Sequence, residues 1–185
     1  MKRILLLLLP IALAVSTQAQ QTSTRSGDLQ FIQNQGQWDE PSLFRVGLFG
    51  GTLFLEPNAF TYTFSNIGDL AHYHHEDPTV SPENFILKRH AYRVQFNHAD
   101  PFARVSGESR RKNYYNYFLG DDEARWKGHV PSYYGVRYSN MYPGIDMVVY
   151  SKSTSLKYDF EIAAGANPGL IEMQYDGLSD IQVTD

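Results

Sequence analysis

The 185-residue sequence contains no cysteine, so the protein has neither a disulfide nor a cysteine nucleophile. It also lacks the G-x-S-x-G pattern of a serine nucleophile elbow. A protein of this composition is held together by burial of apolar side chains, which a chain of this length can supply as one domain. Nucleophilic catalysis by a cysteine, or by a serine in that motif, is excluded.

An excess of positive charge is also missing. The chain has 16 lysines and arginines against 20 aspartates and glutamates, which gives a formal net charge of −4. The segment Arg110–Phe118 interleaves basic and aromatic residues, as surfaces that bind single-stranded nucleic acid do. A net acidic chain nevertheless lacks the broad basic field that attracts nucleic acid or an anionic membrane, and we expect neither partner.

Long hydrophobic runs are absent except for one near the start. The run Ile4–Val15 is interrupted by Pro10 and is shorter than the roughly 20 apolar residues that span a bilayer. The basic pair Lys2-Arg3 precedes it, and the small residues Thr17 and Ala19 follow it. This order predicts a signal peptide with cleavage after Ala19, a mature chain without a membrane span, and a secreted or cell-surface location.

The rest of the chain is rich in residues that favour strands and turns, with 13 tyrosines, 11 phenylalanines and 14 glycines. Apolar and polar residues alternate in short segments, which is the pattern of half-buried strands. Residues 44–48, 52–56 and 60–64 predict a three-stranded meander. Its turns are expected at Gly50-Gly51 and Pro57-Asn58.

Further strands are predicted downstream, and only Asp121–Trp126 has the character of a short helix. The predicted strands cover residues 90–96, 113–118, 133–138, 145–150, 156–162 and 170–175. Residues 66–88 show no sustained period and carry turn formers, so we expect a long loop there. Asp180–Asp185 has the pattern of the middle of a strand.

These segments predict an all-β fold, an antiparallel β-sandwich-like domain of about ten short strands with little helix. The expected organisation is a signal peptide over residues 1–19, a flexible mature N-terminus over residues 20–30, and a single β-rich domain over residues 31–185. No internal repeat or low-complexity linker divides that domain. It is expected to be the N-terminal part of a longer protein.

The order of several short motifs resembles a known family. The motifs are Phe31–Trp38 (FIQNQGQW), Gly50-Gly51, Asn116–Gly120 (NYFLG), Trp126, Tyr142–Asp146 (YPGID), Lys157–Phe160 (KYDF) and Tyr175–Gly177 (YDG). Together they resemble the N-terminal domain of unknown function of large secreted bacterial proteins. Those proteins often carry SBBP β-propeller repeats, PKD-type domains and gliding-motility-associated sorting domains.

The resemblance covers roughly Phe31 to the end and implies that a full-length member continues past residue 185. It implies no catalytic residues, because none are established for the family. In the opening motif, this chain has Gln33 and Gln35 where the family usually has acidic and basic residues.

The run His72–Asp77 (HYHHED) brings three imidazoles and two carboxylates together, which are enough ligand types for a zinc or copper site. Such a site also needs fixed geometry and outer hydrogen-bond partners, and this polar loop shows no sign of either. We favour a solvated loop. His72, His74 and His75 are therefore assigned no metal, and no cofactor is expected.

Nine aromatic residues fall between Tyr114 and Tyr142, a density that suits two roles. Flat aromatic faces on a β-sandwich can bind sugars, which would make this protein a carbohydrate-binding module. Aromatic side chains also fill the cores of β-sheets, and we favour that second role.

Asp146 and Asp159 are the candidate acid pair for glycoside hydrolysis, which needs two carboxylates across a cleft. Matching the apolar faces of their strands predicts a hairpin that sets the two aspartates opposite each other. The other predicted pairs are Val149 with Leu156, Met147 with Tyr158, and Ile145 with Phe160. Asp146 also follows the turn Pro143-Gly144, where an aspartate readily accepts backbone hydrogen bonds, and we favour this structural role.

We therefore expect a non-enzymatic structural or interaction module of an exported, cell-surface or extracellular multidomain protein. The alternative is a carbohydrate-binding module, and a third reading is a glycan-active hydrolase that uses paired acids. No residue is assigned a catalytic, cofactor-binding or metal-binding role. The expected partners are downstream domains of the same chain and a glycan or surface protein.

Overall fold

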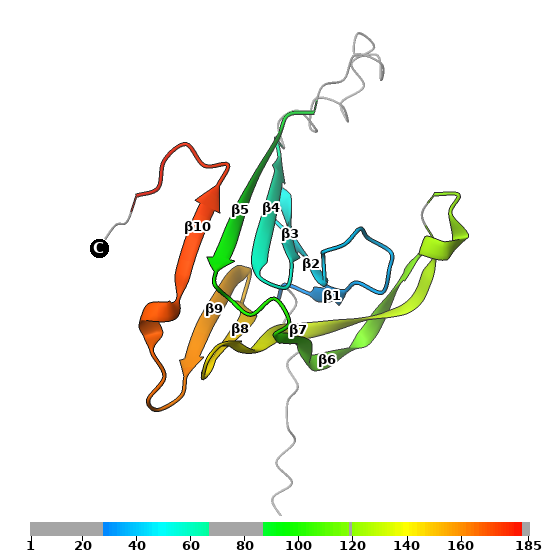
Figure 1. Ribbon diagram of the computed structural model, residues 1–185. Helices are drawn as coiled ribbons and strands as arrows, with labels where there is room; N and C mark the ends of the chain where they lie inside the picture. Colours follow the sequence, from blue (N-terminus) through cyan, green and yellow to red (C-terminus); the bar gives the residue numbers. More distant parts are fainter. Residues whose placement is uncertain (1–27, 67–86, 119, 183–185) are drawn as a thin grey trace, which may run out of the picture.

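The computed structural model describes residues 28–66, 87–118 and 120–182, and ten strands in one antiparallel sheet make up most of these residues (Figure 1). Two 3-10 helices, η2 (Glu123–Arg125) and η3 (Pro168–Leu170), join strands in these ranges. The strands are β1 (Phe31–Gln33), β2 (Phe44–Leu48), β3 (Gly51–Leu55), β4 (Ala59–Ser65), β5 (Arg89–Asn97), β6 (Arg104–Tyr117), β7 (Lys127–Tyr142), β8 (Ile145–Lys152), β9 (Ser155–Ile162) and β10 (Glu172–Asp176).

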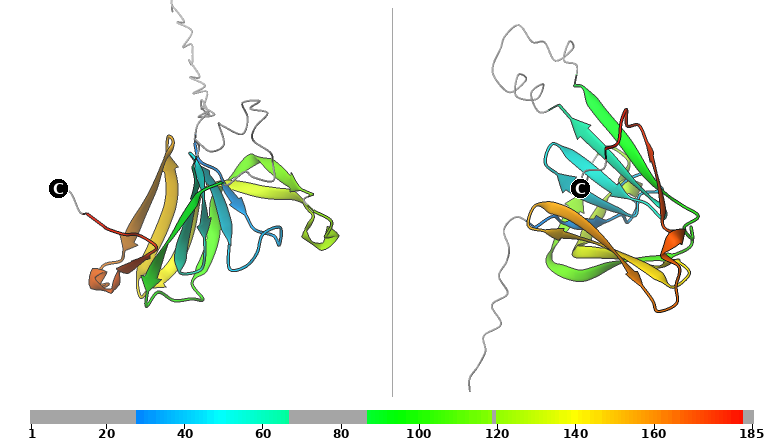
Figure 2. Two further views of the ribbon diagram at one scale, coloured as in Figure 1. Left: turned by 90° about the horizontal axis from the view of Figure 1, so that it is seen from above. Right: turned by 90° about the vertical axis from the view of Figure 1, so that its left-hand side faces the viewer.

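The sheet runs in the order β10-β5-β4-β3-β2-β1-β7-β8-β9, and β6 pairs with β7. It curls into a half-barrel, so that the hairpin arm (β7–β9) folds toward the meander arm (β2–β5 with β10), as the two views of Figure 2 show. The long β6–β7 hairpin projects to one side with η2 at its tip (Figure 1). The prediction of an all-β antiparallel fold with about ten strands and little helix is confirmed.

The core lies inside the curl because every second side chain of each arm points there. Phe60 and Phe96 of the meander arm are buried, and their rings lie 6.2 Å and 6.4 Å, between centroids, from Tyr158 and Phe160 of the hairpin arm. The fully buried side chains also include Phe31, Val46, Leu53, Leu55, Val136, Tyr138, Ile145, Met147 and Val149.

Two tyrosines of β7 tie the arms together through their hydroxyl groups. Tyr138 donates to the carbonyl oxygen of Glu56 (2.9 Å), and Tyr142 donates to that of Asn97 (3.1 Å). Burial raises the pKa of Tyr138 well above its usual value, so its hydroxyl keeps its proton and remains a donor. Each bond gives a buried polar group a partner.

The predicted meander is confirmed. β2, β3 and β4 pair in sequence with Leu48 opposite Gly51 and Leu55 opposite Phe60. The second turn falls at Pro57-Asn58 as predicted, while the first falls at Phe49-Gly50, one residue before its predicted place, since Gly51 already belongs to β3. Gly51 is required there because a Cβ atom would lie 2.3 Å from the carbonyl oxygen of Thr63. The strand predicted over residues 90–96 is β5, and η2 lies within the predicted helical segment.

Three details differ from the sequence predictions. β1 was not predicted, because three residues are too few to show a period. β6 begins at Arg104, nine residues before the predicted strand, since the edge strand has no apolar face to reveal it. Residues 180–182 form no strand, so the final strand predicted over Asp180–Asp185 is wrong for the part that the structure describes.

The predicted register of the β8–β9 hairpin is also wrong. The strands pair Met147 with Phe160 and Val149 with Tyr158, two positions away from the prediction. Lys152 pairs directly with Ser155, so the turn between the strands has two residues. A shift by two keeps every side chain on its predicted face, which is why matching the faces could not detect it.

Several predictions lie outside the described residues. They are the signal peptide over residues 1–19, most of the flexible N-terminus, and nearly all of the loop over residues 66–88. Within the described ranges, no helix has both the length and the apolar character needed to cross a membrane.

Candidate functional site

Asn34 organises the loop between β1 and β2, in which Trp38 lies. Its amide nitrogen donates to the carbonyl oxygens of Trp38 (3.0 Å) and Ser42 (2.7 Å), and its Oδ1 accepts from the backbone N–H groups of Gly36 (3.0 Å) and Trp38 (3.2 Å). Gly36 has a φ of +101°, which residues with a side chain rarely adopt. The motif that opens the family resemblance therefore fixes the position of a tryptophan.

The indole of Trp38 is half-buried and held by neighbours from two strands. The ring of Tyr117 on β6 meets it edge-on at 5.1 Å between centroids. The guanidinium of Arg45 on β2 lies 5.4 Å from the centroid of the Trp38 ring, a cation–π distance. These contacts place the indole over the outer face of the sheet, opposite to the core.

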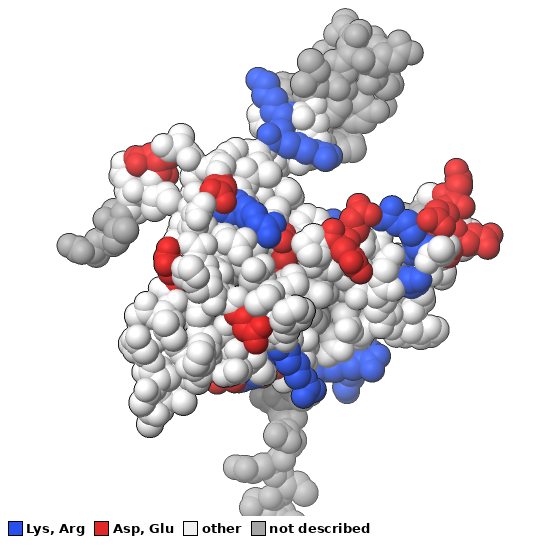
Figure 3. Space-filling model, in the orientation of Figure 1, with Lys and Arg blue, Asp and Glu red and all other residues white. Residues whose placement is uncertain are grey.

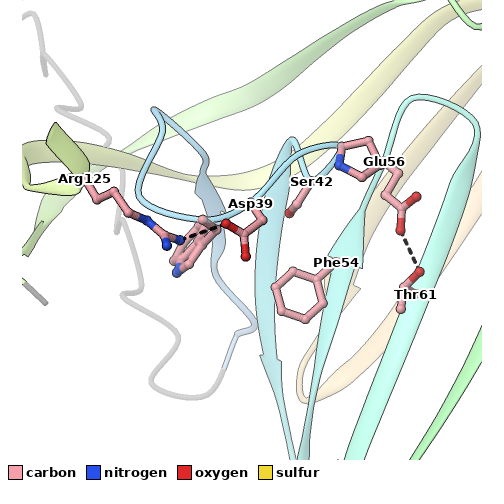
Figure 4. A pocket seen from close by; sticks show the side chains of 8 residues that line it. Asp39, Ser42, Phe54, Glu56, Thr61 and Arg125 are labelled. Atoms are coloured by element: carbon pink, nitrogen blue, oxygen red, sulfur yellow. Dashed lines mark hydrogen bonds and ion pairs between the residues drawn. The ribbon is translucent and has the colours of Figure 1, made fainter. Parts of the chain in front are cut away.

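A hollow of about 310 Å³ opens beside Trp38 (Figure 4). Two polar pairs lie at its sides, and Figure 4 shows the ring of Phe54 between them. Arg125 Nη2 donates to Asp39 Oδ1 (3.1 Å), and Thr61 Oγ1 donates to Glu56 Oε1 (2.6 Å). The hollow is lined by Trp38, Asp39, Pro41, Ser42, Phe54, Glu56, Thr61 and Arg125.

Glu56 is the buried charge of this hollow, with only 4% of its surface exposed. Its Oε2 lies 2.6 Å from Arg93 Nη1 and forms an ion pair with it, although the angles are not those of a hydrogen bond. Arg93 also donates to Thr61 Oγ1 at 3.3 Å, so the three side chains support one another. Burying a carboxylate is costly unless it is paired, and the pairing with Arg93 makes this position tolerable.

Two further hollows adjoin the first, and together the three form what we call the Trp38 groove. One has a volume of about 340 Å³, shares Trp38 and Arg125, and reaches Asp121 and Asp122 at the tip of the β6–β7 hairpin. The other, of about 620 Å³, shares Phe54 and runs along β3, β4 and β5 past Thr52 and Thr63. The groove thus crosses the outer face of the meander arm.

Asp146, the first candidate acid, lies in a cluster around Arg137 rather than beside Asp159. Arg137 Nη1 donates to Asp146 Oδ2 (3.0 Å) and to Glu161 Oε2 (2.6 Å), and its Nε donates to Glu108. Hydrogen bonds to these carboxylates raise the pKa of Arg137, and the bond from Arg137 lowers the pKa of Glu161. The cluster joins the outward faces of β6, β7, β8 and β9.

Asp146 also accepts the backbone N–H of Asn140 at 2.7 Å through Oδ1. Asn140 has a φ of +53°, and its side chain accepts from the N–H of Gly144 at 3.0 Å. The aspartate therefore holds the bulge and turn between β7 and β8. Its two oxygens are occupied by structural bonds, as the structural reading of the sequence expects.

Asp159, the second candidate acid, is opposite Val148 and not opposite Asp146. Its Oδ2 accepts from the hydroxyl of Tyr150 at 2.9 Å, and this bond raises the pKa of Tyr150. The residue that faces Asp146 across the hairpin is Glu161. The acid pair that sequence reasoning singled out is therefore not brought together.

The nine aromatic residues between Tyr114 and Tyr142 do not form one flat platform. Tyr138 and Tyr142 are buried in the core, as core packing predicts. On the surface, Tyr114 packs on His129 at 4.5 Å, and Arg111 lies 3.8 Å from the centroid of the Tyr134 ring. The aromatic density thus divides between the core and separate surface contacts.

The three candidate metal ligands His72, His74 and His75 lie outside the described residues. Among the residues that the structure does describe, no group of three or more histidine, aspartate and glutamate side chains is arranged to hold a metal ion.

Sequence reasoning missed the Trp38 groove and the Arg137 cluster. Arg125 and Asp39 are 86 positions apart, so no local pattern could join them. A signal for Glu56 did exist, because it is the only acidic residue of the meander between Phe44 and Phe64 and it directly precedes a turn. Burial of that acid shows only in the folded chain.

Comparison with known proteins gives one match. Residues 31–185 match the model of a family described as a domain of unknown function (DUF7948). No curated protein and no solved structure matches the chain.

Proposed function

We propose that this chain, which belongs to the DUF7948 family over residues 31–185, is a non-enzymatic interaction module of an exported multidomain protein. The groove described above is built on that family's domain. The Trp38 groove is the observation that carries the proposal. A half-buried tryptophan fixed by its own loop, beside a hollow with paired polar groups, has the character of a binding site.

The arrangement of the acids supports a binding role over a catalytic one. A general acid must keep a proton near neutral pH, which requires a raised pKa. The pKa of Glu161 is instead lowered by Arg137, and both oxygens of Asp146 accept hydrogen bonds. In the groove, Asp39 and Glu56 are paired with Arg125 and Arg93.

Export and a multidomain setting rest on the sequence. The first 19 residues carry the basic, apolar and small-residue zones of a signal peptide. The motif order resembles the N-terminal domain of secreted proteins with SBBP repeats, PKD-type domains and sorting domains. Downstream domains of the same chain are thus the proposed covalent partners, while the groove is left for a ligand.

Two measurements test this function. N-terminal sequencing of the exported product is expected to begin at Gln20, and recovery of an intact Met1 from the extracellular pool would contradict export. A screen with chromogenic glycosides is expected to show no turnover by the purified protein. Turnover that is lost in Asp146→Asn, with stability kept, would overturn the non-enzymatic role.

A further inference from the structure

The three hollows of the Trp38 groove are neighbours, because the central hollow shares lining residues with each of the other two. Trp38 and Arg125 join the first hollow to the hairpin tip, and Phe54 joins it to the larger hollow along β3–β5. We propose that this groove binds a linear, neutral oligosaccharide, with one sugar ring seated between Trp38, Phe54 and Glu56. This proposal rests on the interaction role proposed above and names its ligand class.

The size of the central hollow suits a single sugar ring. Its volume of about 310 Å³ is at the lower end of the roughly 300 to 1,000 Å³ that small-molecule sites occupy. The adjoining hollows, of about 340 Å³ and 620 Å³, extend the site in two directions. An extended chain of rings uses all three, whereas a single small molecule uses one.

The walls offer the two surfaces that a pyranose needs. One face of a sugar ring carries C–H groups, which pack against the face of an aromatic ring, and Trp38 and Phe54 provide such rings here. The rim of the ring carries hydroxyl groups, and the polar side chains Glu56, Thr61 and Asp39 line the same hollow. The central hollow thus has both aromatic and polar walls.

The polar groups keep spare hydrogen-bonding capacity. Glu56 Oε1 accepts one bond from Thr61, and a carboxylate oxygen can accept two. A guanidinium has five N–H groups, and Arg125 uses one of them on Asp39. Arg93 holds Glu56 from the other side, so the carboxylate is oriented before any ligand arrives.

The charges favour a neutral ligand. Asp39 is paired with Arg125 and Glu56 with Arg93, so the central hollow has no net charge that would recruit an ion. The hairpin tip carries Asp121, Asp122 and Glu123, and Figure 3 shows acidic side chains gathered there. Like charge at that end disfavours acidic polysaccharides, whereas Arg45 and Arg89 line the larger hollow at the other end and disfavour cationic ligands. Hydroxyl groups, which both donate and accept, match this lining.

Tryptophan fluorescence gives a direct test, because the chain has only two tryptophans. Trp126 lies outside the groove lining and contacts Phe118, so Trp126→Phe leaves Trp38 as the single reporter. Cellohexaose, laminarihexaose, mannohexaose and chitohexaose are titrated separately, each beside its monosaccharide. At least one hexasaccharide is expected to change the Trp38 emission in a saturable way, and to bind at least about tenfold more tightly than its monosaccharide.

Calorimetry on variants then locates the site. Trp38→Ala is expected to weaken binding of the selected hexasaccharide at least about tenfold, as loss of a central aromatic contact typically does. Trp38→Phe keeps a ring and is expected to restore part of the affinity. Phe102→Ala, at an exposed residue that lines none of the three hollows, is the control and is expected to bind as the wild type does.

A polar variant keeps the test independent of folding. Glu56→Gln removes the negative charge that pairs with Arg93 and can therefore affect folding, so Thr61→Val is measured beside it. Circular dichroism confirms that each variant is folded. Both folded variants are expected to bind more weakly than the wild type. Unchanged binding in Trp38→Ala, or in every folded polar variant, would overturn the groove as the site.

Charged probes distinguish the ligand class. Hexalysine and hexagalacturonate are expected to bind more weakly than the neutral hexasaccharide. Stronger binding of either, or no binding of any neutral hexasaccharide at millimolar concentration, would overturn the proposal. Neither result affects the proposed non-enzymatic role, which fails only if turnover is found.

Discussion

At the scale of single residues, Arg137 determines what the neighbouring acids can do. It contacts Glu108, Asp146 and Glu161, which come from three other strands. An arginine surrounded by carboxylates keeps them ionised and oriented. Asp146 is therefore a structural residue: one oxygen bonds Arg137 and the other bonds the backbone of the β7–β8 bulge.

Asp146→Asn is expected to lower the free energy of unfolding by about 1 kcal/mol, because the amide oxygen still accepts from Asn140 while the charge facing Arg137 is lost. Asp146→Ala removes both bonds and is expected to cost about 2 to 3 kcal/mol. Urea denaturation measures both, with Asp159→Asn as the exposed control. Equal stability of the two Asp146 variants would contradict the backbone role.

The pH dependence of stability provides a second prediction. Arg137 lowers the pKa of Glu161 from its usual 4.5, so folding favours the ionised form. That stabilisation is present above the unfolded pKa and is lost as the pH falls through the lower folded pKa. Stability is therefore expected to decline below about pH 4.5. Denaturant titrations should show a shallower decline in Glu161→Gln and in Arg137→Gln, and parallel curves for all three proteins would refute this.

At the scale of elements, the β6–β7 pair depends on a glycine that is covered by an aromatic ring. A Cβ atom at Gly107 would lie 2.4 Å from the ring of Tyr133, which in turn meets Phe44 edge-on at 6.0 Å. The ring of Tyr133 thus covers the glycine and connects the β6–β7 hairpin to β2. The long hairpin is fixed where it leaves the rest of the sheet.

Gly107→Ala is expected to lower the free energy of unfolding by about 1 to 3 kcal/mol, the usual cost of overpacking, since the Tyr133 ring must move. Gly47→Ala is the matched control, because a Cβ atom there meets nothing within 4 Å. That variant is expected to be neutral or slightly more stable than the wild type. Thermal unfolding compares them, and equal losses in both would argue against the ring contact.

At the scale of the whole molecule, side chains and not backbone hydrogen bonds hold the two ends of the curled sheet together. β9 pairs with β8, and β10 pairs with β5, and among the described strands each has that one neighbour. Phe160 of β9 nevertheless meets Phe96 of β5, and the hydroxyl of Tyr158 lies 3.8 Å from the sulfur of Met173 on β10. The curl closes through these contacts.

Phe160→Ala is expected to reduce the free energy of unfolding by about 2 to 3 kcal/mol, somewhat below the cost for a fully buried phenylalanine because Phe160 is half-buried. Phe102, which is 92% exposed, supplies the control, and Phe102→Ala is expected to change stability by less than about 0.5 kcal/mol. Denaturant unfolding of both proteins is the measurement. No loss in Phe160→Ala would mean that the curl closes without this ring.

The sequence was sufficient wherever a short segment carries its own pattern. Alternation and turn residues place the meander, since the side-chain period of two and the backbone needs of a turn are local properties. The position of Asp146 after Pro143-Gly144 likewise indicated its structural role. Family membership was visible in the order of motifs, and Asn34 and Gly36 show how one of those motifs holds a tryptophan in place.

Only the tertiary structure decided the register of the β8–β9 hairpin, because a shift by two residues leaves every side chain on the same face. It alone joined Arg137 to acids on three other strands, and it alone set Trp38 and Arg125 beside the buried Glu56. Contacts between residues far apart in the chain depend on how the sheet curls. Local periodicity carries no information about that curl, so the sequence determined most of the strands and the folded sheet determined the groove.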